Sequence, residues 1–205
     1  MIDFFEPPKI DYSKIICHSG GALGSDKEWS RIGEFYGVKT VDYSYKTKYH
    51  DSPNKFEISD EDYKEGINEV RKANHWLNRY AINNYMNLLA RNWAQVKYSN
   101  QTFAIGRILD IGEKGSKGYY SKSKYQCLDG GTAYCVMMSI NHNRDVYVYD
   151  QYKEKWFHWS YNSMTFVESN IPKISVQNFA GVGTREINDK GTQAIRDVYQ
   201  KTFNF

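Results

Sequence analysis

Short apolar runs alternate along the chain with longer segments in which apolar residues recur every three or four positions. Short runs of this kind are typical of buried strands, and the longer spacing is that of one helix face. The apolar runs predict strands at residues 14–18, 38–43, 102–105, 145–149 and 174–180, with a small antiparallel extension at 156–159 and 165–167. The helical spacing predicts helices at residues 29–36, 59–80, 85–96, 133–140 and 190–202.

The alternation of strands and helices predicts the fold class. Strands separated by helices pair in parallel, and the connecting helices cover both faces of the sheet. We therefore predict a Rossmann-like three-layer α/β domain with a mostly parallel sheet, a helical insert at residues 59–96 and the small antiparallel extension. Residues 1–13 are expected to form an extended leader, 44–58 a loop, and 110–125 a mobile loop or short hairpin. No internal repeat or long linker divides the chain, so residues 1–205 are expected to form a single domain.

The composition excludes several classes of protein. The 27 basic and 24 acidic residues leave a formal net charge of +3, too even for a dedicated nucleic-acid or membrane-surface binder. No apolar stretch approaches the roughly 20 residues of a membrane span, and the amino terminus lacks the pattern of a secretion signal. The three cysteines contain no CxxC pair and indicate reduced thiols. We expect a cytoplasmic protein, in the host cytoplasm if the source is viral, with no membrane contact and with nucleic acid disfavoured as a partner.

Three glycine-rich segments stand between a predicted strand and a predicted helix. They are SGGALGSD at 19–26, DGGT at 129–132 and GVGTR at 181–185. The parallel strands of an α/β sheet bind ligands at their carboxyl ends, where such turns lie. Glycine lets the backbone approach a phosphate closely, and the first amides of the next helix favour an anion. A single Gly-Gly turn is most often only a turn, but three together predict a phosphate site.

The turns and nearby polar residues supply the candidate site. Hydroxyl groups and a guanidinium add donors for phosphate oxygens, and Arg91 and Gln95 share one helix face. The candidate binding residues are Ser19, Gly20, Gly21, Asp26, Arg79, Arg91, Asn92, Gln95, Arg107, Gly130, Gly131, Thr132, Tyr134, Gly181, Gly183, Thr184 and Arg185. Structural interpretations compete with these roles. Asp26 is equally suited to favouring the helix dipole, Arg91 to a solvated helix with Trp93 in the core, and the tyrosines of 119–125 to a surface loop rather than a lid.

Other kinds of site are disfavoured. None of the three turns matches GxGxxG or the Walker pattern, which argues against generic dinucleotide or ATP binding. Ser19 is not in a GxSxG motif, so serine hydrolysis is not expected. The five histidines are scattered, which favours structural roles, and we predict no metal and no cofactor.

The three turns together resemble the SLOG superfamily, which includes DNA-processing protein A and the Lonely Guy phosphoribohydrolases. HSGGALGSD at 18–26 is similar to the SGGAxGAD element that phage and bacterial members carry. FAGVGTR at 179–185 resembles the GIGSR element, and LDGGTAY at 128–134 resembles the later GGT turn. Many relatives carry GIGSR before SGGAxGAD, whereas here the order is reversed; a circular permutation would leave the same loops adjacent in space. The resemblance implies a phage-type nucleotide-binding domain that forms a homo-oligomer.

The resemblance also bears on catalysis. The hydrolase relatives use a GGxGTxxE turn whose Glu assists cleavage of the N-glycosidic bond, and this position falls on Met137. A thioether cannot act as a general base, which leaves Asp26 and Asp129 as catalytic candidates. We therefore expect a protein that binds a nucleotide or nucleotide-derived molecule, such as a cyclic nucleotide or an ADP-ribose-like signal, and sequesters it as a phage counter-defence protein. The alternative is a nucleotide N-glycosidase. A third interpretation, DNA binding as in DNA-processing protein A, is disfavoured by the net charge.

Overall fold

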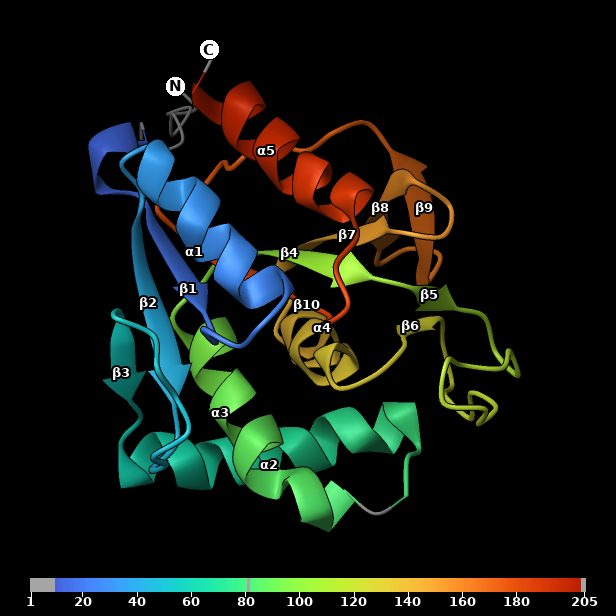
Figure 1. Ribbon diagram of the computed structural model, residues 1–205. Coiled ribbons are helices and arrows are strands. Elements are labelled where there is room, and N and C mark those ends of the chain that lie inside the picture. Colours follow the sequence, from blue (N-terminus) through green and yellow to red (C-terminus); the bar gives the residue numbers. More distant parts are fainter. Residues whose placement is uncertain (1–9, 81, 204–205) are drawn as a thin grey trace, which may run out of the picture.

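A computed structural model describes residues 10–80 and 82–203, and it has the predicted mixed α/β architecture (Figure 1). An eight-stranded sheet has the order β3-β2-β1-β10-β4-β7-β8-β9. The first six strands in this order are parallel, and β8 and β9 add an antiparallel edge. The strands are β1 (Ile16–Ser19), β2 (Lys39–Ser44), β3 (Lys55–Glu57), β4 (Gln101–Gly106), β7 (Asp145–Asp150), β8 (Lys155–Ser160), β9 (Thr165–Ser169) and β10 (Asn178–Gly183). A separate antiparallel pair consists of β5 (Ile108–Leu109) and β6 (Cys127–Leu128).

Helices cover both faces of the sheet (Figure 1). On one face lie α1 (Ser25–Phe35) and α5 (Asp189–Phe203); on the other lie α2 (Asp60–Leu77), α3 (Met86–Lys97) and α4 (Thr132–Asn141). The central strand β4 is buried on both faces, with Phe103 and Ile105 in the core beneath α1 and α5 and Ala104 in the core beneath the other three helices. Among the described residues, no helix is both long enough and apolar enough to cross a membrane.

The strand order places a topological switch at the centre of the sheet. The crossover through α1 leads from β1 to β2 on one side, whereas the crossover through α4 leads from β4 to β7 on the other. β10 lies between β1 and β4 and pairs with both. In open α/β sheets, ligands bind at the carboxyl ends of the strands beside such a switch. The segments that follow β1, β10 and β4 all lie at this edge.

Several strands differ from the sequence-based prediction. β3 lies within residues 44–58, predicted as a loop, because its three residues are exposed at the sheet edge and form no buried run. The last strand begins four residues later than predicted, at Asn178, and extends to Gly183, so Gly181 and Gly183 belong to the strand and not to a turn. The close approach of α1 explains this: a Cβ on Gly181 would lie 2.7 Å from Cγ of Trp29. The β5–β6 pair was not predicted either.

The predicted helices agree with the structure to within a few residues at each end. The 110–125 segment contains a short antiparallel bridge between Lys114 and Tyr120, in keeping with a hairpin. Of the predicted extended leader, residues 1–9 lie outside the described residues, and Tyr12–Lys14 forms a 3-10 turn capped by the side chain of Asp11. The leader prediction is therefore wrong for its last residues.

We predict that Gly181→Ala lowers the free energy of unfolding by about 1–3 kcal/mol, because the new methyl group collides with Trp29 and Cys17 in a packed core. Gly131→Ala is the control, since a Cβ there meets nothing within 4 Å. Urea denaturation monitored by circular dichroism measures both. Equal stabilities for the two variants would contradict a packing role for Gly181.

Candidate functional site

Hydrogen bonds connect the turn after β1 to the end of β10. The Ser19 hydroxyl is fully buried and donates to the carbonyl of Gly181 at 2.6 Å. The backbone N–H and the hydroxyl of Ser25 both donate to the carbonyl of Thr184, at 3.0 and 2.8 Å. Gly24, with a φ of 101°, lies so close to the backbone of Arg185 that a side chain would collide with it. Two of the three predicted glycine segments therefore form one continuous surface.

Asp26 lies in the first turn of α1 and reaches back to β10. Its Oδ1 accepts a hydrogen bond from the backbone N–H of Gly183 at 3.1 Å, and its residue is only 7% exposed. Burial raises the pKa of Asp26 to about 6, although Arg91 and the backbone N–H groups of Gly183 and Ala22 act in the opposite direction. The carboxylate therefore does more than interact with the dipole of α1. It accepts hydrogen bonds from backbone N–H groups of the two glycine-rich segments.

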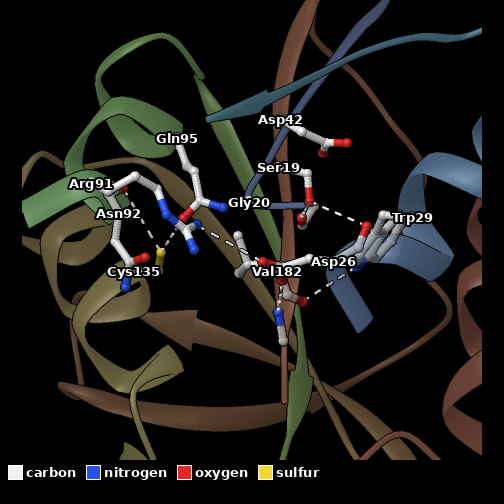
Figure 2. A network of polar contacts seen from close by, with 12 residues as sticks. Ser19, Gly20, Asp26, Trp29, Asp42, Arg91, Asn92, Gln95, Cys135 and Val182 are labelled. Carbon is white, nitrogen blue, oxygen red and sulfur yellow. Dashed lines mark hydrogen bonds and ion pairs between the residues drawn. The ribbon is translucent and has the colours of Figure 1, made fainter. Parts of the chain in front are cut away.

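The side chain of Arg91 approaches Asp26 from α3, which lies on the face of the sheet opposite to α1 (Figure 2). The residue is 4% exposed, and its Nη1 lies 3.9 Å from Oδ2 of Asp26, which is beyond hydrogen-bond distance. Its Nε is buried and has no hydrogen-bond partner among the described residues. The predicted alternative of a solvated helix position for Arg91 is therefore wrong, since the guanidinium is buried and incompletely paired.

Gln95 and Gly20 complete this cluster. With its amide oriented so that Oε1 faces the turn, Gln95 accepts hydrogen bonds from Arg91 Nη1 at 3.2 Å and from the backbone N–H of Gly20 at 2.7 Å. The other atom of the Gln95 amide contacts Sγ of Cys135 on α4 at 3.0 Å. A Cβ on Gly20 would collide with the guanidinium of Arg91 and the carboxylate of Asp26, so a larger residue here would displace both groups.

The DGGT turn is held by its own neighbours. The carboxylate of Asp129 accepts from the backbone N–H groups of Gly130 (2.9 Å) and Ser116 (2.6 Å). Burial raises the pKa of Asp129, but these hydrogen bonds outweigh it, and the pKa lies below the ordinary value. Arg79 donates to the carbonyls of Gly130 and Leu128. The geometry therefore assigns Asp129 and Arg79 to holding the turn in place.

The remaining candidates do not converge on Arg91. Arg107 pairs with Glu113 at 2.6 Å and stacks on the ring of Tyr152, while Arg185 lines an open depression of about 310 Å³ together with Gly24 and Lys27. Tyr134 donates to Asn74 on α2, and Thr184 accepts from the backbone N–H of Glu186. The residues that the structure does bring together are Ser19, Gly20, Asp26, Arg91, Gln95 and Gly183. The others lie around this cluster: Gly21 next to it in the first turn, Asn92 beside Cys135 on the helical side, and Gly131 and Thr132 at the start of α4.

Sequence reasoning missed Asp42 and His50. Asp42, near the end of β2, is directly beside Ser19 in the sheet, is 2% exposed, and accepts from the hydroxyls of Ser30 and Ser52. His50 donates from Nε2 to the carbonyl of Gly20 at 2.9 Å, and its buried Nδ1 has no partner among the described residues. An acidic residue at the end of the second strand, about 20 residues after a glycine turn, was the signal that could have identified Asp42.

The chain matches no family model, no curated protein and no solved structure. The resemblance to the SLOG superfamily therefore stays a prediction based on its three motifs. Met137, at the position of the hydrolase glutamate, lies on α4, is 2% exposed and packs in the core. No group of three or more His, Cys, Asp or Glu side chains within 10–80 and 82–203 is arranged to hold a metal ion.

Asp26→Asn is expected to stabilise the protein at neutral pH. Because the folded-state pKa is about 6 and the ordinary value is 3.8, the folded state favours the protonated acid; stability present below the ordinary value is lost as the pH rises through about 6. The wild type therefore carries a penalty of about 1–3 kcal/mol near pH 7.5 that the amide removes. Asn also keeps an oxygen for the N–H of Gly183.

Thermal unfolding near pH 7.5 and pH 4.5 measures this effect. The gain in melting temperature is expected at the higher pH and should fall to about a third at the lower one, which lies between the two pKa values. Asp129→Asn provides the contrast, because the lowered pKa of Asp129 predicts destabilisation at neutral pH. A loss of stability in Asp26→Asn at both pH values would contradict the raised pKa.

Proposed function

We propose that this protein binds a phosphate-containing, nucleotide-type small molecule at the carboxyl edge of β1, β10 and β4, and holds it intact. The proposal rests mainly on Arg91. Its guanidinium is buried against Gly20 at the topological switch, its Nε has no partner among the described residues, and the nearest carboxylate is 3.9 Å away.

A buried guanidinium is costly unless each N–H finds an acceptor. Arginine presents a planar fork that matches two oxygens of a phosphate. The guanidinium packs directly against the backbone of Gly20, where a side chain would collide with it. A phosphate oxygen would therefore supply the acceptor that the guanidinium lacks.

A nucleotide, rather than a simple anion, is supported by the neighbouring strand. Asp42 lies beside Ser19 at the end of β2, where Rossmann-like domains bind a sugar hydroxyl with an acidic residue. Phosphate and sugar groups of one ligand would then extend from Arg91 towards Asp42. A cyclic nucleotide or an ADP-ribose-like molecule has both groups, and the motif resemblance extends the proposal to sequestration of such a signal as a phage counter-defence.

Cleavage of the N-glycosidic bond is the second candidate, because Asp26 has a pKa of about 6 and would exchange a proton near neutral pH. The buried Met137 argues against it, since it offers no carboxylate at the position of the hydrolase glutamate.

Arg91→Met is expected to weaken ligand binding about ten- to hundredfold, because it removes charge-assisted hydrogen bonds to phosphate. Isothermal titration calorimetry against adenosine and guanosine nucleotides, their cyclic forms and ADP-ribose identifies the ligand first. Arg31→Met is the matched control, since Arg31 pairs with Glu28 on the exposed side of α1. Thermal unfolding of both variants separates lost binding from lost structure, and unchanged affinity in Arg91→Met would refute the site.

Ligand recovered after heat denaturation distinguishes the two functions. A binding protein releases the ligand unaltered, as seen by chromatography. An N-glycosidase releases free base, and Asp26→Asn should then abolish this release. Free base formed by the wild type would overturn the proposal of intact binding.

A further inference from the structure

We propose that the Asp26 carboxylate is an internal anion that makes the site select a phosphodiester over a terminal phosphomonoester. This inference rests on the proposed function, because it concerns the phosphate that Arg91 is proposed to bind. It narrows the ligand class to molecules with one negative charge on each phosphate, such as cyclic nucleotides or diphosphate diesters of the ADP-ribose kind.

Asp26 already occupies part of the place where a phosphate would lie. Its Oδ1 takes the N–H of Gly183 at 3.1 Å, and its Oδ2 is the carboxylate oxygen that faces Arg91. A Cβ added to Gly20 would collide with both Oδ2 and the guanidinium, so no more than the width of an atom separates the two charges from the glycine backbone. Figure 2 shows the carboxylate and the guanidinium facing each other across this position. A phosphate that reaches Arg91 beside Gly20 must therefore lie next to Asp26.

The charge of the ligand then determines how strongly these groups repel or attract it. Two like charges about 4 Å apart repel each other strongly at the dielectric typical of protein sites. A terminal monoester has a second pKa near 6 and carries close to two charges at neutral pH, whereas a diester carries one. Asp26 repels the monoester more strongly than the diester, and Arg91 also attracts it more strongly, so these two effects largely offset each other. The second carboxylate, Asp42, leaves the cluster with one more negative than positive charge, and the selectivity for the diester follows from this excess.

The other groups around Asp26 do not cancel this effect. Asp42 from β2 adds a second negative charge and raises the pKa of Asp26, as does the dominant effect of burial. His50 faces Gly20 from the segment before β3, and Gln95 from α3 is uncharged. Burial raises the pKa of the Cys135 thiol on α4, so it is neutral. Arg91 is the one group among these that carries a fixed positive charge.

The test compares AMP with 3′,5′-cyclic AMP, which share base and sugar and differ in phosphate charge. Calorimetry near pH 7.5 should show the wild type binding the cyclic form about tenfold more tightly. In Asp26→Asn the affinity for AMP should rise about tenfold and that for cyclic AMP by less, so the preference for cyclic AMP shrinks to a small factor. Asp11→Asn removes one exposed carboxylate, the cap of the 3-10 turn before β1, and should leave the ratio unchanged.

A second measurement uses cyclic AMP alone, whose charge does not change between about pH 5.5 and 7.5. Its affinity for the wild type should rise as the pH falls through about 6, and its affinity for Asp26→Asn should stay constant. This also separates Asp26 from His50, because a histidine effect would persist in the variant.

The outcomes are distinguishable. An unchanged AMP to cyclic AMP ratio in Asp26→Asn, or a loss of AMP affinity, overturns the role of Asp26 while leaving the binding function in place. If neither ligand binds either protein, and the wider nucleotide panel also fails, the proposed function itself is refuted.

Discussion

The burial of the Arg91 guanidinium is the constraint on which the carboxyl edge depends. A charge removed from water needs partners, and the chain provides Gln95 from the same helix and Asp26 from α1, while the backbone of Gly20 packs against the guanidinium. These partners come from both sides of the sheet, so the arginine connects the helical layer of α3 to the turn between β1 and α1. The compensation is nevertheless incomplete, because the carboxylate is at 3.9 Å and Nε has no partner in the part of the chain that the structure describes. A site that served stability alone would gain from an apolar residue here, since such replacements of buried ion pairs are often neutral or stabilising.

Glycine is present for different physical reasons in the three glycine-rich segments. Gly20 is needed because a side chain would collide with the arginine and the carboxylate, whereas Gly181 is needed because Trp29 packs directly on its strand. The DGGT turn is closed by Asp129 and Arg79, which satisfy its amide and carbonyl groups internally. The first turn alone combines tight backbone geometry with an unsatisfied buried charge. Glycine therefore marks close approach of another group at Gly20 and Gly181, whereas at Gly130, where a Cβ would meet nothing within 4 Å, it allows a positive φ of 70°.

The sequence was sufficient to predict most of the architecture. The helix α2 could be predicted because its apolar spacing extends over several turns, α4 because a glycine turn opens a buried apolar run, and the central strands because they are short apolar runs. β3 could not, since a three-residue exposed edge strand has no distinguishing pattern. The end of β10 was misplaced because glycine is read as a turn residue when the neighbour that requires it, Trp29, is more than 150 positions away in the chain. Long-range packing of this kind has no local signal.

The same limitation applies to the site. Arg91 and Gln95 were candidates because they share a helix face, but their burial against Gly20 depends on how α3 packs across the sheet edge. Asp42 was missed because its place at the site depends on the strand register that sets it beside Ser19. His50 was missed because the segment that carries it returns to the glycine turn by tertiary folding. In each case the residue type was visible, and the missing information was which distant backbone it meets.

The position of β10 links assembly of the site to completion of the fold. β10 is the last strand in the chain, yet it lies between β1 and β4 and supplies the N–H that Asp26 accepts. The β1 side and the β4 side of the sheet cannot be joined until β10 is inserted between them. Contacts between residues so far apart in the chain form late, because loop closure costs entropy. A ligand held at Arg91 and Gly20 would bind only the form in which β10 is in place, so binding and insertion of the strand are linked. The reversed order of the glycine motifs along the chain is therefore compatible with one site, because the sheet and not the sequence order determines which turns are neighbours.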